Sequence, residues 1–284
     1  MRAGIQEIIE SVTGSTVTRA VKLGGGCVGD VARIELASGK TVVAKTGDAD
    51  SGLAVEGMML AYLRENSGLP VPDVLHASGE ILLMSDLPSG GGLDRATQEH
   101  AADLVAALHN VTRDRFGFEA ETVIGGLPQP NPETVSWIEF FRDARLLYMA
   151  GEAERAGRLP DRLRARLDAM AARLTDWIGE PTAASLIHGD MWTGNVLSHG
   201  GEISGFIDPA IYYADPEIEL AFTTMFGTFG DAFFSRYNEH RPLAPGFFEE
   251  RRDLYNLYPL LVHVRLFGGG YVSSVERTLE RFGF

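Results

Sequence analysis

The first part of the chain changes from a helical to a strand-like pattern of apolar residues. Isoleucine and valine recur at helical spacing from Ile5 to Val12, which predicts a short amphipathic helix. Residues 16–23, 31–36 and 40–46 are rich in β-prone side chains and are separated by glycine-rich or Ser-Gly turns. This pattern predicts an antiparallel meander of three strands.

A helix and one more strand are predicted after this meander. Residues 52–66 have helical apolar spacing, and Pro70 and Pro72 then prevent a helix and favour an extended chain. Residues 81–84 form an apolar run that predicts a strand. These segments complete a small, β-rich part of the chain with one prominent helix.

The polar and glycine-rich run 85–92 is typical of a hinge and precedes a mainly helical remainder. Residues 117–132 contain too much glycine and proline for a helix or strand, so we expect an ordered loop. We therefore expect an α+β fold with two lobes, residues 1–87 and 88–284. Helical apolar spacing recurs in the second lobe at residues 97–109, 137–155, 159–178, 217–226 and 247–267.

Composition narrows the possible partners and compartments. The chain has 284 residues, 45% of them hydrophobic, and a net charge of -14, which repels polyanions and argues against nucleic acid. Apolar runs such as 258–264 are too short to cross a bilayer, and the acidic start does not resemble a signal peptide. One cysteine, Cys27, excludes an intrachain disulfide and suits a reducing compartment. We expect a cytoplasmic protein that does not bind membranes.

Three polar residues stand around a predicted hairpin. Residues 198–202 are turn formers between two apolar runs, so the hairpin places Asn195 and Asp208 side by side at its outer ends. Their oxygens suit one hard cation, and Asp190 in the preceding loop could accept a proton from a hydroxyl. These separations are those of protein-kinase-like phosphotransferases. The alternative is that Asp190 and Asn195 only cap turns.

Gly24, Gly25 and Gly26 lie between the first two predicted strands. Glycines there let the backbone approach phosphate oxygens, although the run lacks the Lys and Ser or Thr of a Walker loop. A glycine-rich turn alone is more often only a turn. Its position ahead of Lys45 favours a nucleotide site.

Lys45 and Glu56 are expected to form an ion pair. Glu56 falls on the apolar stripe of the predicted helix, where a buried carboxylate needs a cation. Lys45, on the third strand, is the only basic residue between Lys40 and Arg64. Such a pair positions the phosphates of ATP in kinases, although either side chain alone could instead reach water.

The segment Ser85, Asp86 and Leu87 follows the strand at 81–84. Its backbone is expected to offer donors and acceptors to the edge of an adenine. This assignment rests on the order of elements along the chain.

Several motifs together resemble those of one family. They are GGGC from Gly24, FGF from Phe116, PQPNP from Pro128, WIEFFRDARL from Trp137, HGDMWTGN from His188 and IDPAIYY from Ile207. The chain resembles the fructosamine kinase, or ketosamine 3-kinase, family within the aminoglycoside-phosphotransferase and protein-kinase-like fold. The resemblance implies phosphorylation by ATP and Mg²⁺ of a sugar hydroxyl on a ketosamine, a type of protein-deglycation repair.

The resemblance also implies roles for individual residues. Asp190 is the implied general base, and Asn195 and Asp208 are the implied magnesium ligands. Lys45 and Glu56 order the phosphates. Trp192 offers an aromatic face to the sugar-amine, which cation–π attraction supports, unless its indole only fills the core.

Two features qualify this resemblance. The sequence Ala214–Asp215–Pro216–Glu217 lacks an arginine expected after the two tyrosines, so an ion pair there is in doubt. Cys27 in GGGC implies a redox-sensitive thiol near the phosphates, whereas a lone cysteine is more often an inert apolar residue. The expected partners are ATP and a sugar-amine or glycated protein, and a homodimer stays open. The alternatives are another small-molecule kinase of the aminoglycoside or choline kinase group, and a silent nucleotide-binding regulator.

Overall fold

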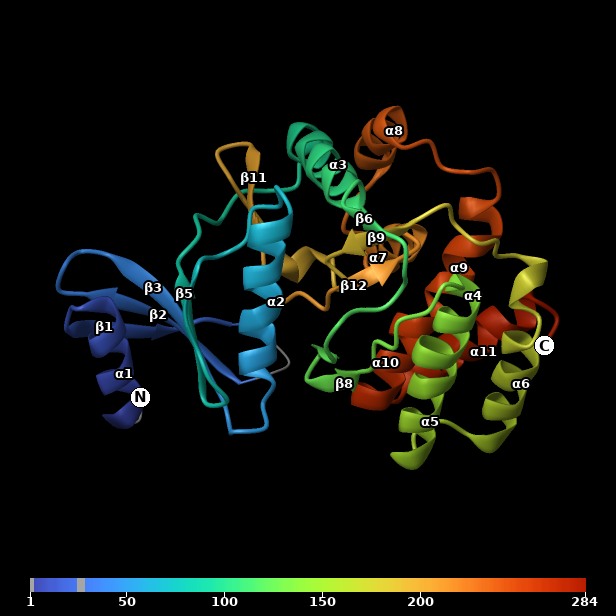
Figure 1. Ribbon diagram of the computed structural model, residues 1–284, viewed down its shortest axis with the longest axis horizontal. Coiled ribbons are helices and arrows are strands. Elements are labelled where there is room, and N and C mark those ends of the chain that lie inside the picture. The colour runs from blue at the N-terminus through green and yellow to red at the C-terminus, as the bar shows by residue number, and fades with distance from the viewer. Residues whose placement is uncertain (1–2, 25–28) are drawn as a thin grey trace.

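The protein divides into a β-rich part and a helical part that lie side by side (Figure 1). The computed structural model describes residues 3–24 and 29–284. The two helices and four strands predicted for the first part are all present, and a fifth strand, Val74–Ala77, was not predicted. The division of the chain at residue 87 stays a prediction.

The β-rich part is a five-stranded antiparallel sheet in the order β1-β2-β3-β5-β4. Alternate residues of strand β5, which lies between β3 and β4, face opposite sides, with Ile81 and Leu83 toward helix α1 and Leu82 toward helix α2. Both faces of β5 are therefore buried. The elements are α1 (Ala3–Thr13), β1 (Val17–Lys22), β2 (Asp30–Leu36), β3 (Thr41–Thr46), α2 (Leu53–Asn66), β4 (Val74–Ala77) and β5 (Ile81–Ser85).

The segment that connects the two parts is tied to a hairpin of the helical part. Gly91 donates its N–H to the Ser198 carbonyl at 2.8 Å, and the Ser198 hydroxyl donates to the Gly92 carbonyl at 3.2 Å. Only glycine fits at position 205, because a Cβ added there would lie 2.2 Å from the Leu87 side chain. The predicted hinge is thus fastened along its length to the hairpin of β10 (Val196–His199) and β11 (Glu202–Phe206).

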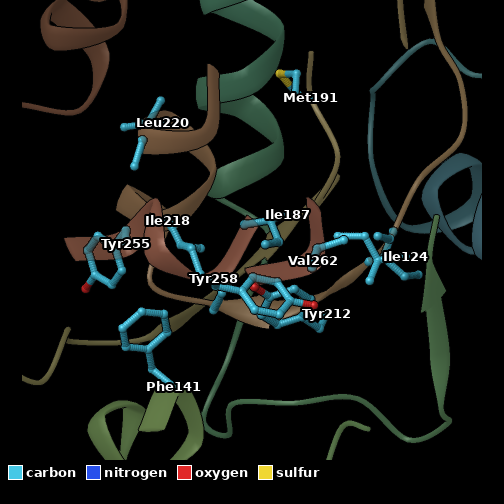
Figure 2. Close-up of a cluster of buried hydrophobic side chains, with 14 of the residues drawn as sticks. Ile124, Phe141, Ile187, Met191, Tyr212, Ile218, Leu220, Tyr255, Tyr258 and Val262 are labelled. Atoms are coloured by element: carbon cyan, nitrogen blue, oxygen red, sulfur yellow. The ribbon is translucent and has the colours of Figure 1, made fainter. Parts of the chain in front are cut away.

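The helical part surrounds a core rich in aromatic residues, part of which Figure 2 shows with Phe141, Tyr212, Tyr255 and Tyr258. Its helices are α3 (Arg95–His109), α4 (Trp137–Phe140), α5 (Tyr148–Arg155), α6 (Asp161–Ala171), α7 (Glu217–Met225), α8 (Asp231–His240), α9 (Arg252–Tyr255), α10 (Leu257–Phe267) and α11 (Gly270–Arg281). None of the described helices is both long and apolar enough to span a membrane.

Several expectations for the helical part were wrong. Residues 117–132 are not wholly irregular, because β7 (Thr122–Ile124) and β8 (Leu127–Gln129) form a hairpin. A π-helical segment, Phe141–Leu147, interrupts the helix predicted at 137–155. The helix expected at 159–178 ends at Ala171, and the one expected at 247–267 is divided near Asn256. The sequence pattern missed α8, α11 and the small sheet of β6 (Thr112–Arg113), β9 (Ala184–Ile187) and β12 (Tyr212–Ala214).

Candidate functional site

A pocket of about 530 Å³ lies between the two parts of the molecule. Every described candidate residue lines it, from both sides: Gly24, Lys45, Glu56, Ser85, Asp86, Leu87, Asp190, Trp192, Asn195 and Asp208. Gly25, Gly26 and Cys27 lie outside the described residues. Positions spread over most of the chain therefore meet in one cavity.

Lys45 sits at the centre of a buried group of charges. Alternation along β3 points Lys45 and Val43 into the pocket, while Val42 and Ala44 pack toward α1. The Lys45 ammonium lies 2.6 Å from the Glu56 carboxylate on α2 and also pairs with Asp208. Burial alone would lower the pKa of Lys45, but the two carboxylates outweigh burial and raise it. Neither Lys45 nor Glu56 extends to water.

Asp208 stands directly beyond the hairpin, in a strained backbone conformation. Its φ of 55° is left-handed, which a non-glycine residue adopts at a cost of roughly 1 kcal/mol or more. The Ile207 N–H donates to the Asn195 carbonyl at 3.0 Å and so closes the outer ends of the hairpin. The hairpin thus brings Asn195 and Asp208 to the same wall of the pocket.

Asp190 follows the buried strand β9 across a turn that only glycine permits. Gly189 has φ of 86°, and a Cβ there would lie 2.1 Å from the Ala210 carbonyl oxygen. The Asn195 amide donates to the Asp190 carboxylate at 3.0 Å. Burial and the charge of Asp208 raise the pKa of Asp190 to about 7, against the opposing effect of this hydrogen bond. The carboxyl is therefore poised to exchange a proton near neutral pH.

The residues around Asp208 fit a magnesium ion that also binds phosphate. The Asn195 amide nitrogen is committed to Asp190, so its carbonyl oxygen is the atom left to bind a cation. Asp208 and Asp190 repel each other, and a cation would relieve this repulsion. Among residues 3–24 and 29–284 no group of three or more His, Cys, Asp or Glu could hold a metal. Mg²⁺ commonly uses one or two protein oxygens and completes its shell with phosphates and water.

Sequence analysis missed a buried network beneath the Asp190 loop. Glu219 on α7 accepts the Gly189 N–H at 2.6 Å and the Nε2 of His109 at 2.9 Å, and His109 Nδ1 contacts the Tyr237 hydroxyl at 2.8 Å. Burial acts to raise the pKa of Glu219, but these partners lower it. Glu219 lies between apolar neighbours in the predicted helix, the same signal that identified Glu56. It fixes the loop that carries Asp190.

The PQPNP motif holds the β7–β8 hairpin against the segment after Asp208. Gln129 donates to the Ala210 carbonyl at 3.1 Å and accepts from the Tyr258 hydroxyl at 2.6 Å. Asn131 donates to the Thr122 hydroxyl at 2.8 Å. The hairpin in turn lines the pocket at residues 123–126.

Arg145, in the π-helical segment, joins this hairpin to the aromatic core. Its fully buried guanidinium donates to the Pro130 carbonyl at 2.7 Å and to the Asn131 side chain at 2.6 Å. It also lies 3.8 Å from the ring centroid of Tyr212 in the IDPAIYY motif. Three separate motifs therefore meet at one arginine. The arginine missing after the tyrosines leaves Glu217 paired all the same, because Arg251, from a distant segment, lies 2.6 Å from its carboxylate.

Trp192 lies at the mouth of the pocket and does not fill the core. The residue is 38% exposed to solvent. A Cβ on Gly194 would lie 2.4 Å from the indole, so glycine at that position is what lets the ring lie over the turn. The alternative in which Trp192 is core filler is therefore wrong.

The segment expected to contact adenine lines the same pocket with part of its backbone already used. The Ser85 N–H donates to the Asp73 carbonyl at 2.9 Å. The Asp86 carboxylate pairs with Arg33 at 2.8 Å. The backbone groups of Asp86 and Leu87 therefore remain as candidates to form hydrogen bonds with the adenine of ATP.

Comparison with known proteins gives one consistent result. The sequence model of the fructosamine kinase family matches residues 1–282. A Synechocystis protein named as a probable ketoamine kinase is 40% identical over 62% of this chain, and the match spans 59% of that protein. A protein-ribulosamine 3-kinase of Arabidopsis thaliana chloroplasts is 30% identical over 94% of this chain and 83% of its own length.

Solved structures share the whole fold. A Thermobifida fusca protein assigned as a fructosamine-3-kinase is 29% identical, with a TM-score of 0.89 over 99% of this chain and 100% of that one. An aminoglycoside phosphotransferase, 16% identical, has a TM-score of 0.69 over 99% of both chains. The predicted two-lobed, kinase-like α+β fold is confirmed.

Proposed function

The chain belongs to the fructosamine kinase family, and from that premise we propose that it transfers the γ-phosphate of ATP to a sugar hydroxyl of a ketosamine. The acceptor is a fructosamine or ribulosamine, free or on a protein. The observation that carries this proposal is the meeting of Lys45, Glu56, Asp190, Asn195 and Asp208 in one pocket.

Asp190 is the group that takes the proton of the attacking hydroxyl. Its pKa near 7 lets it be ionised at physiological pH and still accept a proton during transfer. The sugar oxygen then bonds to the γ-phosphorus as the bond to the β-phosphate oxygen breaks, which leaves ADP. Glu219 keeps the Asp190 loop in place through the Gly189 N–H.

Lys45 and its partners handle the charge of the phosphates. With its ammonium held by Glu56, Lys45 is positioned to bind phosphate oxygens. Asp208 and the Asn195 carbonyl would hold Mg²⁺, which when bound neutralises charge on the phosphates. To hold the ion, Asp208 would have to give up its ion pair with Lys45. Gly24, at the edge of the pocket, leaves space for the phosphates.

The neutral wall of the pocket is suited to the sugar-amine. Trp192 offers its face to sugar C–H groups and to the substrate ammonium. The β7–β8 hairpin adds Val123, Ile124 and two glycines to the lining of the pocket. The pocket therefore separates a charged region for phosphates from an aromatic region for the acceptor.

A substrate panel tests this proposal directly. The purified chain, ATP and Mg²⁺ are incubated with fructosyl-lysine, ribulosyl-lysine, an aminoglycoside and choline, and ADP release and phosphorylated product are measured. We expect phosphorylation of at least one ketosamine and loss of activity in EDTA. Turnover of the aminoglycoside or choline alone would overturn the acceptor class, and full activity in EDTA would overturn the metal assignment.

The two alternatives are not favoured. A silent regulator has no need of the ionisable set around Asp190, and an aminoglycoside kinase is matched only at a level of identity that indicates fold. Tight ATP binding without turnover of any acceptor in the panel would support the alternative of a silent nucleotide-binding regulator.

A further inference from the structure

Aromatic side chains continue from Trp192 out of the pocket and across the surface. Trp192 and Phe226 have ring centroids 6.2 Å apart, and Phe226 and His263 lie 5.2 Å apart. His263 then contacts Tyr271 at 4.8 Å and Phe267 at 5.7 Å. We call Phe226, His263, Phe267 and Tyr271 the aromatic tract.

The tract contains a large share of the exposed large hydrophobic side chains of the described residues. Phe226 is 39% exposed and Phe267 is 55% exposed. With Trp192 they make three of the seven large hydrophobic side chains that are exposed in the described part of the chain. Large apolar side chains that are both exposed and contiguous mark binding surfaces more often than isolated ones do.

The surrounding backbone holds the tract next to the pocket. Gly268 and Gly269, with φ of 65° and 59°, turn the chain between α10 and α11 so that Phe267 and Tyr271 can meet. Gly125, at the tip of the β7–β8 hairpin, approaches Leu266 so closely that an added Cβ would be 2.9 Å from it. Strand β8 lies beside α10 in Figure 1. The hairpin that walls the pocket therefore also borders the tract.

The tract is neutral. The Nδ1 of His263 lies 2.7 Å from the Pro259 carbonyl, and burial lowers the pKa of the imidazole, so His263 is uncharged at neutral pH. None of its four residues is a carboxylate or a fixed cation. The chain as a whole has a net charge of -14. The tract is thus suited to an apolar or aromatic group that carries no negative charge.

We propose that the aromatic tract is a subsite for the substituent on the substrate amine, and that it favours ketosamines whose amine bears an aromatic group. This inference rests on the proposed function. With the sugar between Trp192 and Asp190, the substituent leaves the pocket across Trp192. The next surface it meets there is Phe226, followed by His263 and Phe267.

The test compares two acceptors with the same sugar, one built on phenethylamine and one on methylamine. We expect kcat/KM of the wild type to be at least about tenfold higher for the phenethylamine adduct, mainly through KM, because each aromatic contact contributes about two- to tenfold. In Phe226→Ser and Phe267→Ser the ratio of the two kcat/KM values should each fall about threefold or more. Phe248→Ser removes a Phe that is 42% exposed and packs on Phe234 instead, so its ratio should equal that of the wild type.

The outcomes separate this inference from the proposed function. Phosphorylation of both adducts with equal kcat/KM in the wild type, or an unchanged ratio in both tract variants, would overturn the subsite and leave the ketosamine kinase intact. If neither adduct nor any ketosamine of the panel is phosphorylated, the proposed function fails and the subsite fails with it.

Discussion

The two walls of the pocket are held by different forces. The ion-pair wall consists of Lys45, Glu56 and Asp208, where each buried charge has a partner. The hairpin wall consists of β7–β8 and is fixed by neutral amides, by aromatic rings and by the buried Arg145. The ion-pair wall carries the charges that phosphate transfer requires, whereas the hairpin wall defines a shape.

This difference teaches where each property of the protein resides. Charges on the ion-pair wall act over a few ångströms on the transfer of phosphate from ATP. This step could be the same for many acceptors. The hairpin wall depends on contacts among segments far apart in the chain, from Gln129 to Tyr258. Changes to the ion-pair wall should therefore lower turnover, and changes to the hairpin wall should alter the use of the acceptor.

Asp190→Asn should have the largest effect because Asp190 is the proposed proton acceptor. Loss of the proton acceptor should lower kcat by about 10²- to 10⁴-fold. The folded pKa of Asp190 is raised to about 7, so wild-type stability that is present at low pH is lost as pH rises through that value. Asn avoids this loss, and its advantage in unfolding free energy should grow by roughly 2.5 kcal/mol between about pH 5 and about pH 8.

Urea unfolding of both proteins at the two pH values measures this effect. The Asn side chain can still accept the Asn195 hydrogen bond, so the comparison isolates the charge. A stability difference that is independent of pH would contradict the raised pKa, and an unchanged kcat would remove Asp190 from the role of base.

Lys45→Met should break the ion-pair wall. We expect kcat/KM for ATP to fall about 100- to 1,000-fold. The Glu56 carboxylate loses its cation, at a cost of roughly 3 to 5 kcal/mol in unfolding free energy. The double variant Lys45→Met/Glu56→Gln should regain much of that stability and none of the activity. If the double variant is no more stable than Lys45→Met, the unpaired Glu56 carboxylate is not the cause of the lost stability.

Arg145→Met should damage the hairpin wall and spare the other. The variant leaves the Pro130 carbonyl and the Asn131 side chain without their donor, so unfolding free energy should fall by roughly 3 kcal/mol. KM for the ketosamine should rise about tenfold, while KM for ATP stays within about twofold.

Arg142→Met is the matched control for this change. Arg142 pairs with Asp143 at the surface, so its loss should change stability by no more than about 0.5 kcal/mol. Equal increases in both KM values for Arg145→Met would mean that the two walls are not separable.

The parts of the site that the sequence predicted are local ones. The hairpin before Asp208 is set by a turn of two glycines between short apolar runs, and its geometry alone brings Asn195 and Asp208 together. Lys45 and Glu56 are only eleven positions apart, and the apolar stripe around Glu56 indicated its burial. Their roles in catalysis stay predictions, but their positions could be inferred from neighbouring residues.

The parts that escaped prediction depend on distant segments or on misleading signals. Strand β9 has four residues and pairs with partners of two and three, too short for a detectable period. Arg145 was not identified as a buried residue, because a buried arginine has no signature in sequence spacing. The β7–β8 hairpin did have a signal, a Gly-Gly turn between apolar residues, which the surrounding prolines obscured.

Gly194→Ala should give the smallest effect and tests the edge between the two walls. The new methyl group would meet the Trp192 indole at 2.4 Å, so the ring must move from its place at the mouth of the pocket. KM for the ketosamine should rise about fivefold, with KM for ATP and stability little changed, because a partly exposed ring can shift at small cost. Gly68→Ala, where nothing lies within 4 Å of the added Cβ, is the control. If Gly194→Ala raises KM for ATP as much as for the ketosamine, Trp192 does not belong to the region that binds the acceptor, and the boundary between phosphate and sugar lies elsewhere in the pocket.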